Sequence, residues 1–259
     1  MTLKAIKFLG QNWLTDETIL EKIIAAAGDI QKQQILEIGP GTGLLTERLL
    51  GAGAHVTAVE LDPRAQDFVA KKFQKSKRFQ LIRKSILNQS VSELMEGNQY
   101  RVIANIPYNI TSPIVKKFMS EEEMRPTEML LMVQREVAER IADTKKRSVL
   151  SISVEVFAES EVLFVVPPEA FDPPPKVHSA IIRITTRPKP LVPNNEQQQF
   201  FKVVKAGFLS KRKKLKNTLI PALGLPKDTD IATIFGSVDS NRRAENLIIS
   251  EWQEIAKNL

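Results

Sequence analysis

Side chains suited to ligand binding cluster first in a glycine-rich segment early in the chain. Glu37-Ile38-Gly39-Pro40-Gly41-Thr42-Gly43 follows an apolar run typical of a buried strand and precedes a helical pattern of leucines. Glycines at such a junction let the backbone turn tightly and let a ligand approach without a Cβ in the way. Leu44 stands where a G-x-G-x-x-G fingerprint has its third glycine, so the spacing disfavours a nicotinamide dinucleotide and the oxidoreductases that use one.

The E-x-G-x-G-x-G spacing instead resembles the turn that holds a nucleoside joined to methionine in Rossmann-like methyltransferases. Glu60 ends the next predicted strand, seventeen residues after Gly43, where its carboxylate can accept hydrogen bonds from both ribose hydroxyls. Ligands of parallel sheets bind at the carboxyl ends of strands, and Gly39, the region after Ile82 and Asn105 also fall at such ends. We therefore expect S-adenosylmethionine as the cofactor.

A second motif, Asn105-Ile106-Pro107-Tyr108, closes a predicted strand on the same side of the sheet. An adenine amino group is a poor nucleophile because its lone pair is delocalised into the ring. The Asn105 side-chain oxygen and the Ile106 main-chain carbonyl are candidate acceptors for its two N–H groups. Pro107 stiffens the turn, and Tyr108 can stack on an unstacked base. Catalysis would then rest on positioning and electrostatic stabilisation, without a metal or a covalent nucleophile.

Alternating strand and helix patterns must position these residues. Strands are predicted at 34–38, 55–59, 79–82, 100–104 and 129–133, and helices at 44–50 and 62–73. The alternation predicts an α/β fold with a Rossmann-like, doubly wound and mostly parallel sheet. Two later strands, 151–157 and 180–185, are expected to form an antiparallel hairpin at the edge of the sheet.

A proline-rich segment at 187–195 predicts a stiff linker, because proline at alternate positions interrupts regular structure. Beyond it, short helices are expected to build a small all-helical domain. We predict a methyltransferase domain at 1–187 and a small helical domain at 188–259.

Composition narrows the classes of function. The chain has 259 residues, 42% of them apolar and none of them cysteine, which excludes disulfides, zinc ribbons and thiol nucleophiles. Two histidines, His55 and His178, are too few to build a metal site by themselves. No apolar run is long enough to span a membrane, and the start, Met1-Thr2-Leu3-Lys4, lacks the apolar region of a secretory signal. We expect a cytoplasmic, metal-free monomer.

The net charge of +7 is concentrated in two stretches, 71–84 and 200–220, each with seven basic residues and no acidic one. The rest of the chain carries 23 basic and 30 acidic side chains. Such a distribution indicates a polyanionic partner. Lys211, Arg212, Lys213 and Lys214, expected on a helix beside Phe208, are the predicted contacts with RNA phosphates. The 71–84 stretch can equally be a solvated helix face.

Taken in order, several segments resemble the KsgA-type small-subunit ribosomal RNA adenine dimethyltransferases across nearly the whole chain. Besides the glycine turn and Val59-Glu60-Leu61-Asp62, the matching segments are the entry motif 9–14, the catalytic segment 105–113, a helix at 134–140, the proline-rich loop 171–177, and two helical segments at 208–219 and 241–245. The resemblance implies methylation of two adjacent adenosines in a hairpin loop near the 3′ end of small-subunit ribosomal RNA, during ribosome assembly. It also implies that the helical domain at 188–259 binds RNA and the ribosome.

The resemblance and the motifs together define a predicted site. The expected cofactor-binding residues are Gln11, Asn12, Leu14, Glu37, Gly39, Gly41, Gly43, Glu60, Leu61, Ser85, Ile86 and Asn105. The expected catalytic residues are Asn105, Pro107 and Tyr108, and Phe171 is expected to pack against the target base.

The chain departs from the family pattern at three positions. Ser85 stands where the family usually has an aspartate that accepts from the adenine amino group of the cofactor, so we expect weaker cofactor binding and little change in chemistry. Trp13 replaces a phenylalanine and keeps an aromatic cover over the pocket. His178 stands where aspartate is common and is assigned no role.

Two alternative functions share these motifs. An Erm-type methyltransferase, which acts on large-subunit ribosomal RNA, has the same catalytic core, although the Pro173-Pro174-Pro175-Lys176-Val177 loop and 241–245 favour the small-subunit enzyme. A non-catalytic assembly factor that binds immature subunits is left open by Ser85. Intact Glu37, Glu60 and the Asn105–Tyr108 motif argue for retained activity.

Overall fold

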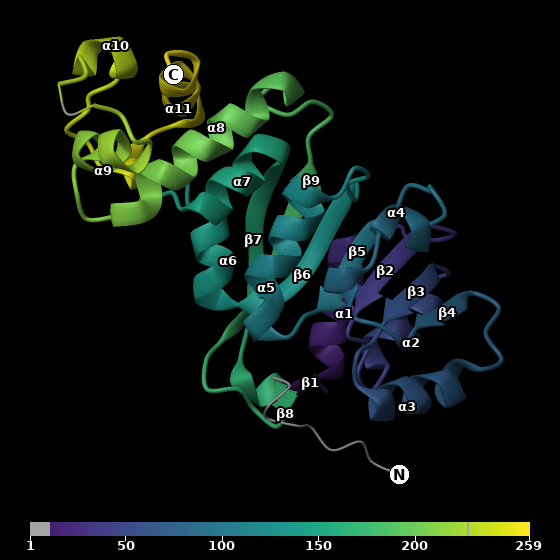
Figure 1. Cartoon of the computed structure of the whole chain (residues 1–259). Coiled ribbons are helices and arrows are strands. Elements are labelled where there is room, and N and C mark those ends of the chain that lie inside the picture. Colours follow the sequence, from purple (N-terminus) through teal and green to yellow (C-terminus); the bar gives the residue numbers. More distant parts are fainter. Residues whose placement is uncertain (1–10, 227) are drawn as a thin grey trace. The chain divides into compact units, whose positions relative to one another are not determined.

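A computed structural model describes residues 11–226 and 228–259. The residues Leu9 and Gly10 of the entry motif and the segment Met1–Lys4 lie outside this part. The central feature is a seven-stranded sheet with the order β4-β3-β2-β5-β6-β9-β7, in which β4 and β7 form the two edges (Figure 1). This confirms the predicted α/β class with a doubly wound sheet.

The five predicted strands are all present, two of them displaced or extended by one residue. The strands of the large sheet are β2 (Gln34–Ile38), β3 (His55–Val59), β4 (Phe79–Ile82), β5 (Arg101–Asn105), β6 (Glu128–Gln134), β7 (Ala158–Val166) and β9 (Ser179–Thr186). Strands β2 to β6 pair in parallel, whereas β9 is antiparallel to β6. The chain adds β3 and β4 on one side of β2 and then β5 on the other, so the topological switch lies between β2 and β5.

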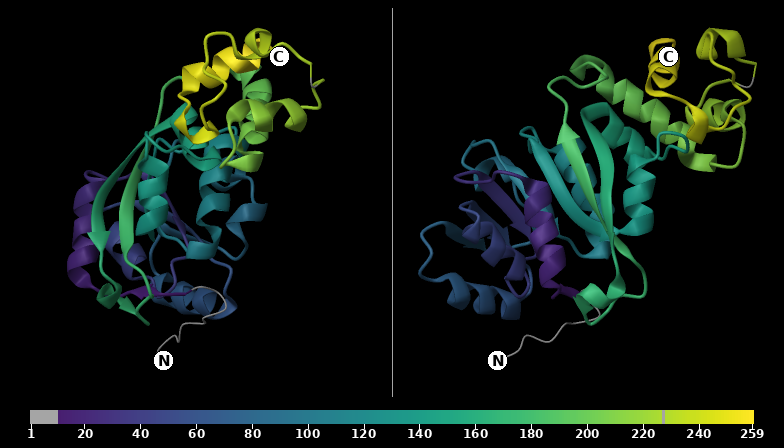
Figure 2. Two further views of the ribbon diagram at one scale, coloured as in Figure 1. Left: turned by 90° about the vertical axis from the view of Figure 1, so that its left-hand side faces the viewer. Right: turned by 180° about the vertical axis from the view of Figure 1, so that it is seen from behind.

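The two predicted helices of the parallel part are confirmed as α2 (Leu44–Gly51) and α3 (Pro63–Phe73), and three further helices accompany them. These are α1 (Glu17–Ala27), α4 (Val91–Leu94) and α5 (Thr111–Lys116), the last followed by a π-helical turn at Lys117–Glu121. Asp62 caps α3 by accepting from the Arg64 N–H, and Pro63 occupies the first turn. Figure 2 shows α1, in purple, lying along one face of the sheet. Ile35 and Leu36 are neighbours on β2 and are both fully buried, so both faces of the sheet are covered.

The predicted strand at 151–157 is wrong, because this segment is helix α7 (Val149–Phe157). Its β-branched residues favour a strand, but Ser148 and Ser151 form a capping box that starts a helix. Apolar side chains occupy nearly every position, so a short run of this kind has no decisive period. The strand that lies beside β9 is β7, while the predicted strand at 180–185 is confirmed within β9.

The chain divides into two compact units. The first holds the residues up to Glu139 and Glu159–Thr186, and the second holds Arg140–Ala158 and Arg187–Leu259. The longer segment of the second unit starts at Arg187, where the sequence predicts a boundary, and the shorter segment contains α7. Two backbone hydrogen bonds, from Arg187 to Phe157 and from Leu191 to Val156, tie the proline-rich segment to α7 within this unit.

Helices account for the second unit, as predicted for its C-terminal part. They are α6 (Arg135–Ala142), which spans the boundary, α7, α8 (Asn194–Gly207), α9 (Leu215–Ala222), α10 (Ile231–Phe235) and α11 (Ile249–Lys257), with short 3-10 turns η6 (Phe208–Ser210) and η7 (Ala244–Asn246). Phe157 stacks on Phe201, and Trp252 is fully buried. A Cβ at Gly207 would lie 2.4 Å from the Trp252 ring, so glycine permits this close packing.

Candidate functional site

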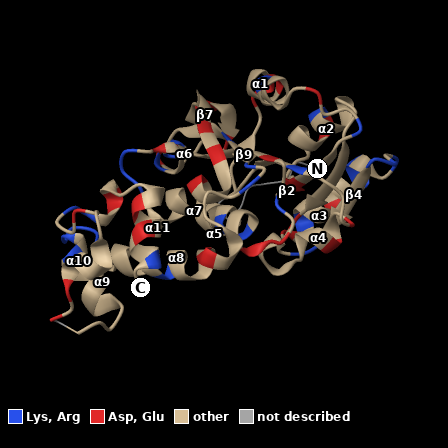
Figure 3. Ribbon diagram, turned by 90° about the horizontal axis from the view of Figure 1, so that it is seen from above, with Lys and Arg blue, Asp and Glu red and all other residues tan. Residues whose placement is uncertain are grey.

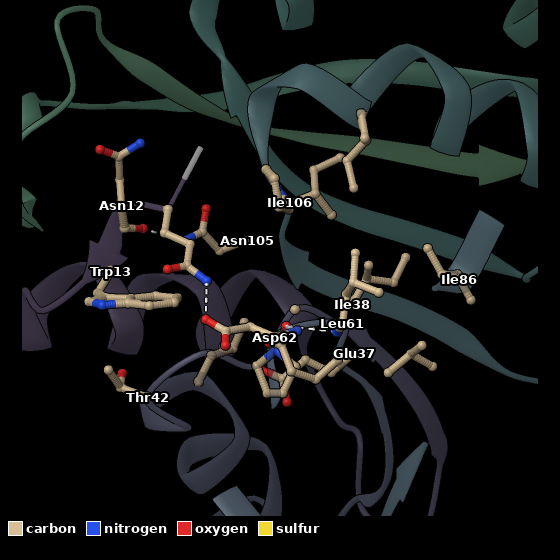
Figure 4. A pocket seen from close by; sticks show the side chains of 18 of the residues that line it. Asn12, Trp13, Glu37, Ile38, Thr42, Leu61, Asp62, Ile86, Asn105 and Ile106 are labelled. Atoms are coloured by element: carbon tan, nitrogen blue, oxygen red, sulfur yellow. Dashed lines mark hydrogen bonds between the residues drawn. The ribbon is translucent and has the colours of Figure 1, made fainter. Parts of the chain in front are cut away.

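A cavity of about 370 Å³ opens at the carboxyl ends of β2, β3, β4 and β5, within the first unit. Its walls come from the glycine turn after β2, Glu60 and Leu61 after β3, Ser85 after β4, and Asn105 to Ile110 after β5. The segment Gln11–Leu14, which we call the strap, supplies the remaining wall (Figure 4). The cavity lies at the topological switch of the sheet, where α/β proteins bind their ligands.

The glycine turn has the backbone conformation that its sequence requires. The φ angles are +68° at Gly39, +56° at Gly41 and +71° at Gly43, and residues with a Cβ rarely adopt such angles. A Cβ on Gly41 would lie 2.4 Å from the ring of Trp13, and one on Gly43 would lie 2.7 Å from that of Phe73. Gly39 lines the cavity, whereas Gly41 and Gly43 act behind it by allowing these aromatic rings to pack against the turn.

Glu60 is held in place by three backbone N–H groups. One carboxylate oxygen accepts from Gly41, and the other accepts from Leu61 and Asp62 at 2.8 and 2.9 Å. Burial raises the pKa of Glu60 above its ordinary value, and the three N–H donors partly offset this effect. A carboxylate has about four lone-pair sites, and three are used by these donors, so Glu60 keeps acceptor capacity for one further hydrogen bond, from a hydroxyl of a ligand.

Glu37 lies deeper, at the end of β2, and is 1% exposed. Its carboxyl group is 2.6 Å from the Thr46 hydroxyl. The pKa of Glu37 is raised to about 8, mainly by burial. The hydrogen bond from Thr46 and the charge of Lys72 oppose this rise, and the charge of Glu60 adds to it. At neutral pH this side chain is therefore mostly protonated, which avoids a second negative charge beside Glu60.

The strap is attached to both sides of the cavity. On one side Gln11 donates to Asp62, 2.8 Å away, and Arg64 binds the same carboxylate. The hydrogen bonds from Arg64, and to a smaller extent the one from Gln11, hold the pKa of Asp62 down at about 2. On the other side Trp13–Leu14 forms β1, which pairs antiparallel with β8 (Phe171–Asp172). The strap therefore links Asp62, at the start of α3, to the segment that precedes the proline-rich loop.

Asn105 has a defined side-chain orientation. Its amide nitrogen is 3.2 Å from the Asn12 carbonyl oxygen (Figure 4). Since a carbonyl only accepts, the NH₂ group must face Asn12, and Oδ1 is left on the other side. In the described part of the chain no group donates to Asn105 Oδ1 or to the Ile106 carbonyl oxygen. Two adjacent acceptors thus lie without donors at the wall of the cavity.

Tyr108 lines the same wall, in the 3-10 turn η3 (Tyr108–Ile110). Burial raises the pKa of its hydroxyl, which stays protonated, and the hydroxyl is 2.5 Å from Ser179 Oγ. Pro107, with φ −56°, precedes this turn and fixes the direction in which the chain leaves β5.

Leu61, Ile86 and Ser85 form the end of the cavity nearest β4. Leu61 is 61% exposed, whereas Ile86 is buried. Ser85 precedes the 3-10 turn η2 (Ile86–Asn88) without capping it, and within residues 11–226 and 228–259 its hydroxyl has no hydrogen-bond partner. This end therefore offers apolar surface and one free hydroxyl.

Most of the predicted site residues meet in this cavity. Those that line it are Gln11, Asn12, Leu14, Glu37, Gly39, Glu60, Leu61, Ser85, Ile86, Asn105, Pro107 and Tyr108. Phe171 is placed elsewhere: it is 4% exposed and lies in the core opposite Leu14 in the β1–β8 pair. Lys211 to Lys214 lie in the second unit, where all four are exposed in a turn between η6 and α9 and not on the expected helix.

Sequence reasoning missed three residues that hold the site in place. Asp62 receives Gln11 from 51 residues away, and Ser179 meets Tyr108 from 71 residues away. No local pattern reports partners this distant. Thr46, which contacts Glu37, lies in the first turn of α2. The helical pattern of the sequence places Thr46 on this helix, but it does not indicate the contact with Glu37.

The cavity fits S-adenosylmethionine. The glycine turn leaves room for backbone contact, Glu60 offers an acceptor for a ribose hydroxyl, and Leu61 with Ile86 supplies apolar surface for a base. The described residues contain no group of three or more side chains suited to a metal ion and no helix long and apolar enough to cross a membrane. Fold and cavity together define an S-adenosylmethionine-dependent methyltransferase.

Comparisons with known proteins identify the family. The model of the ribosomal RNA adenine dimethylase family matches residues 2–259. A ribosomal RNA small subunit methyltransferase A of Dehalococcoides mccartyi is 39% identical over 98% of this chain and 88% of its own length. Its counterpart in Enterococcus faecalis is 38% identical, over 98% of this chain and 90% of its own length. The chain therefore belongs to the ribosomal RNA adenine dimethylase family.

Solved structures share the fold. The 23S rRNA methyltransferase ErmE superposes with a TM-score of 0.74, at 24% identity, over 96% of this chain and 99% of its own. A dimethyladenosine transferase from Plasmodium falciparum superposes with a TM-score of 0.77, also at 24% identity, over 94% of this chain and 95% of its own. At this level of identity the likeness supports the architecture alone.

Proposed function

We propose that this enzyme transfers methyl groups from S-adenosylmethionine to the exocyclic amino groups of two adjacent adenosines in a 3′-terminal hairpin loop of 16S ribosomal RNA. The products are dimethyladenosines, formed during ribosome biogenesis. The pair of free acceptors at the end of β5, Asn105 Oδ1 and the Ile106 carbonyl oxygen, carries this proposal. The names of the 37–39% identical relatives support the small subunit as the target.

The chemistry follows from these acceptors. The bound cofactor supplies an electrophilic methyl group on a sulfonium. Asn105 Oδ1 and the Ile106 carbonyl accept the two N–H groups of the target, which favours a tetrahedral nitrogen with an available lone pair. Tyr108 stacks on the flipped base and holds the nitrogen in line with the methyl group. The target nitrogen would take up the methyl group that the cofactor supplies and would then release its proton to water.

Each part of the chain has a place in this proposal. Residues 1–187 form the methyltransferase domain, with the cavity residues binding the cofactor. Residues 188–259 form the RNA- and ribosome-binding domain, in which Lys211, Arg212, Lys213 and Lys214 contact RNA phosphates. In support, these four basic side chains are exposed, and the adjacent Leu209 is 72% exposed. We assign Phe171 to the support of the strap, because its side chain is buried behind Leu14.

The deciding experiment uses methyl-labelled S-adenosylmethionine and small subunits from cells that lack this modification. Free ribosomal RNA and large subunits serve as controls, and mass spectrometry identifies the modified nucleosides. We expect dimethyladenosine in small-subunit RNA alone. Label in large-subunit RNA would indicate the Erm-type activity. Binding to small subunits without any label would indicate a non-catalytic assembly factor.

An asparagine variant tests the acceptor role directly. Asn105→Ala should lower kcat by about 10²-fold, the usual cost of losing one preorganised polar group in an active site. Asn98→Ala is the matched control, since Asn98 also donates to a backbone carbonyl but lies outside the cavity. Equal activity of Asn105→Ala and the unmodified enzyme would remove Asn105 from the mechanism.

We further propose that the enzyme is a cytoplasmic monomer. Sedimentation of the purified chain at micromolar concentration should give a single species of 29.1 kDa. Cell fractionation should recover the activity with free and ribosome-bound cytoplasmic protein. A stable dimer or a membrane-bound fraction would contradict these two statements.

A further inference from the structure

Tyr108 is held by a residue that no motif of the sequence indicates. Its hydroxyl lies 2.5 Å from Ser179 Oγ, although 71 residues separate the two positions. Tyr108 belongs to a turn of three residues, η3, which has no side-chain cap. Ser179 is fully buried and begins β9. The hydrogen bond therefore joins a side chain on a short turn to the seven-stranded sheet.

Ser179 is itself firmly placed. It lies opposite Gln134 at the last register position of the antiparallel β6–β9 pair. The residue before it, His178, accepts a backbone hydrogen bond of 3.0 Å from Arg135. The backbone that carries the Ser179 hydroxyl is therefore fixed, because β6 and β9 are paired up to this position.

The tyrosine, by contrast, needs an anchor. It is only half-buried, and it is the first residue of the three-residue turn that lies between Pro107 and α5. A ring that rotates about two side-chain bonds must be ordered before a base can stack on it, and this ordering costs binding energy. A hydrogen bond from the sheet removes that cost in advance.

We propose that Ser179 is a positioning residue, whose hydroxyl fixes the Tyr108 ring in the orientation that receives the target base. This inference rests on the proposed function, in which Tyr108 stacks on the flipped adenine. Ser179 does not touch the cofactor or the reacting atoms. It acts through Tyr108 alone, so its removal should affect the RNA substrate and leave the binding of the cofactor product unchanged.

A double-mutant cycle on the full-length chain tests the pair. Ser179→Ala and Tyr108→Phe each remove one partner of the hydrogen bond and keep the ring or the backbone. Each should lower kcat/KM for small subunits about three- to tenfold, as expected for one hydrogen bond. The double variant should be no worse than the more affected single variant. The Kd of S-adenosylhomocysteine, measured by calorimetry, should stay within about twofold in all three.

A matched serine variant controls for the loss of a buried hydroxyl. Ser153 is buried, and its hydroxyl donates to the Val149 carbonyl at 2.9 Å in α7. Ser153→Ala should leave kcat/KM unchanged. A comparable fall for Ser153→Ala would mean that Ser179→Ala acts through stability, and it would overturn the inference.

The ring can also be observed directly, because the chain has only two tyrosines, Tyr100 and Tyr108. Incorporation of 3-fluorotyrosine should give two ¹⁹F signals, and Tyr108→Phe identifies the one from Tyr108. In Ser179→Ala this signal should shift and change in width as the ring becomes mobile, while the Tyr100 signal stays in place. An unchanged Tyr108 signal would overturn the inference without any measurement of activity.

The outcomes separate this inference from the function on which it rests. If Tyr108→Ala methylates small subunits normally, the proposed stacking role of Tyr108 fails. If Tyr108→Ala is inactive but Ser179→Ala and the double variant show independent, multiplying effects, the stacking role survives and the positioning role of Ser179 is wrong.

Discussion

Ser85 is the member of the predicted cofactor-binding set whose type departs from the family pattern. It lines the cavity, and its hydroxyl has no hydrogen-bond partner in the described residues. A hydroxyl at this position can both donate and accept, whereas a carboxylate accepts more strongly from an amino group. The residue type at position 85 should therefore affect the affinity for the cofactor and not the rate of methyl transfer.

Restoring the carboxylate should tighten the cofactor complex. We expect Ser85→Asp to lower the Kd of S-adenosylmethionine by roughly tenfold, about 1.5 kcal/mol for one charge-assisted hydrogen bond. Titration calorimetry measures it. Ser92→Asp adds the same charge outside the cavity and should leave the Kd of S-adenosylmethionine unchanged. An unchanged Kd in Ser85→Asp would show that Ser85 does not face the cofactor.

Glu37 should make folding stability depend on pH. Burial raises its pKa to about 8 from 4.5, so the folded chain holds this proton more tightly than the unfolded chain does. The contribution of protonated Glu37 is complete below pH 4.5 and is lost as the pH rises toward 8, by up to about 1.4 kcal/mol per pH unit.

Urea unfolding between pH 5 and pH 8 measures this contribution. Glu37→Gln keeps a neutral hydrogen-bonding side chain beside Thr46 and cannot titrate. The unfolding free energy of the unchanged protein should therefore fall with pH relative to that of Glu37→Gln. Parallel curves for the two proteins would mean that Glu37 is ionised in the folded state throughout this range.

The turn after β2 shows how backbone shape and packing act together. Gly41 combines a φ of +56° with contact against the Trp13 ring of the strap. The turn and the strap thus form one wall of the cavity. A change in the turn should displace the strap, and with it the Asn12 carbonyl that orients Asn105.

Two glycine variants separate strain from collision. Gly41→Ala places a Cβ 2.4 Å from Trp13, while Gly97→Ala, at φ +71°, meets nothing within 4 Å. Both should lose about 1 kcal/mol or more of stability from the left-handed conformation. Only Gly41→Ala should also weaken the binding of S-adenosylhomocysteine, by tenfold or more. Equal binding by the two variants would show that Trp13 does not cover the bound ligand.

The net positive charge of the chain indicates a polyanionic partner, and Figure 3 shows Lys and Arg in blue and Asp and Glu in red. The two basic stretches, 71–84 and 200–220, differ in whether their charges form ion pairs. In the first unit, Lys72 pairs with Glu47 and Arg83 with Asp67, so part of that charge is neutralised locally. In the second unit, Lys211, Arg212 and Lys213 form no ion pair within the described residues. Unpaired cations are better suited to RNA phosphates.

Binding to the RNA hairpin should weaken steeply as salt rises. Replacing Lys211, Arg212 and Lys213 with alanine should reduce the slope of log affinity against log salt by about 0.7–0.9 for each phosphate that is no longer neutralised. The triple variant of Lys71, Lys75 and Lys77 removes equal charge from the other stretch and should change the slope less. Fluorescence anisotropy over a range of salt concentrations compares them. The opposite ranking would move the RNA contact to the first unit.

The parallel strands, the glycine turn and the identity of most cavity residues were predictable from the amino-acid sequence. These features are local: a strand followed by E-x-G-x-G-x-G needs only its own backbone angles, and parallel strands bring their carboxyl ends to one edge. Features that depend on distant partners emerged only in the folded chain. Helix α7 replaced a predicted strand, because in an apolar run buried along its length the Ser148 cap and the surrounding packing outweigh β propensity. Ser179 reached Tyr108 for the same kind of reason, since only the completed sheet, in which β6 lies between β5 and β9, brings the start of β9 within reach of the turn after β5.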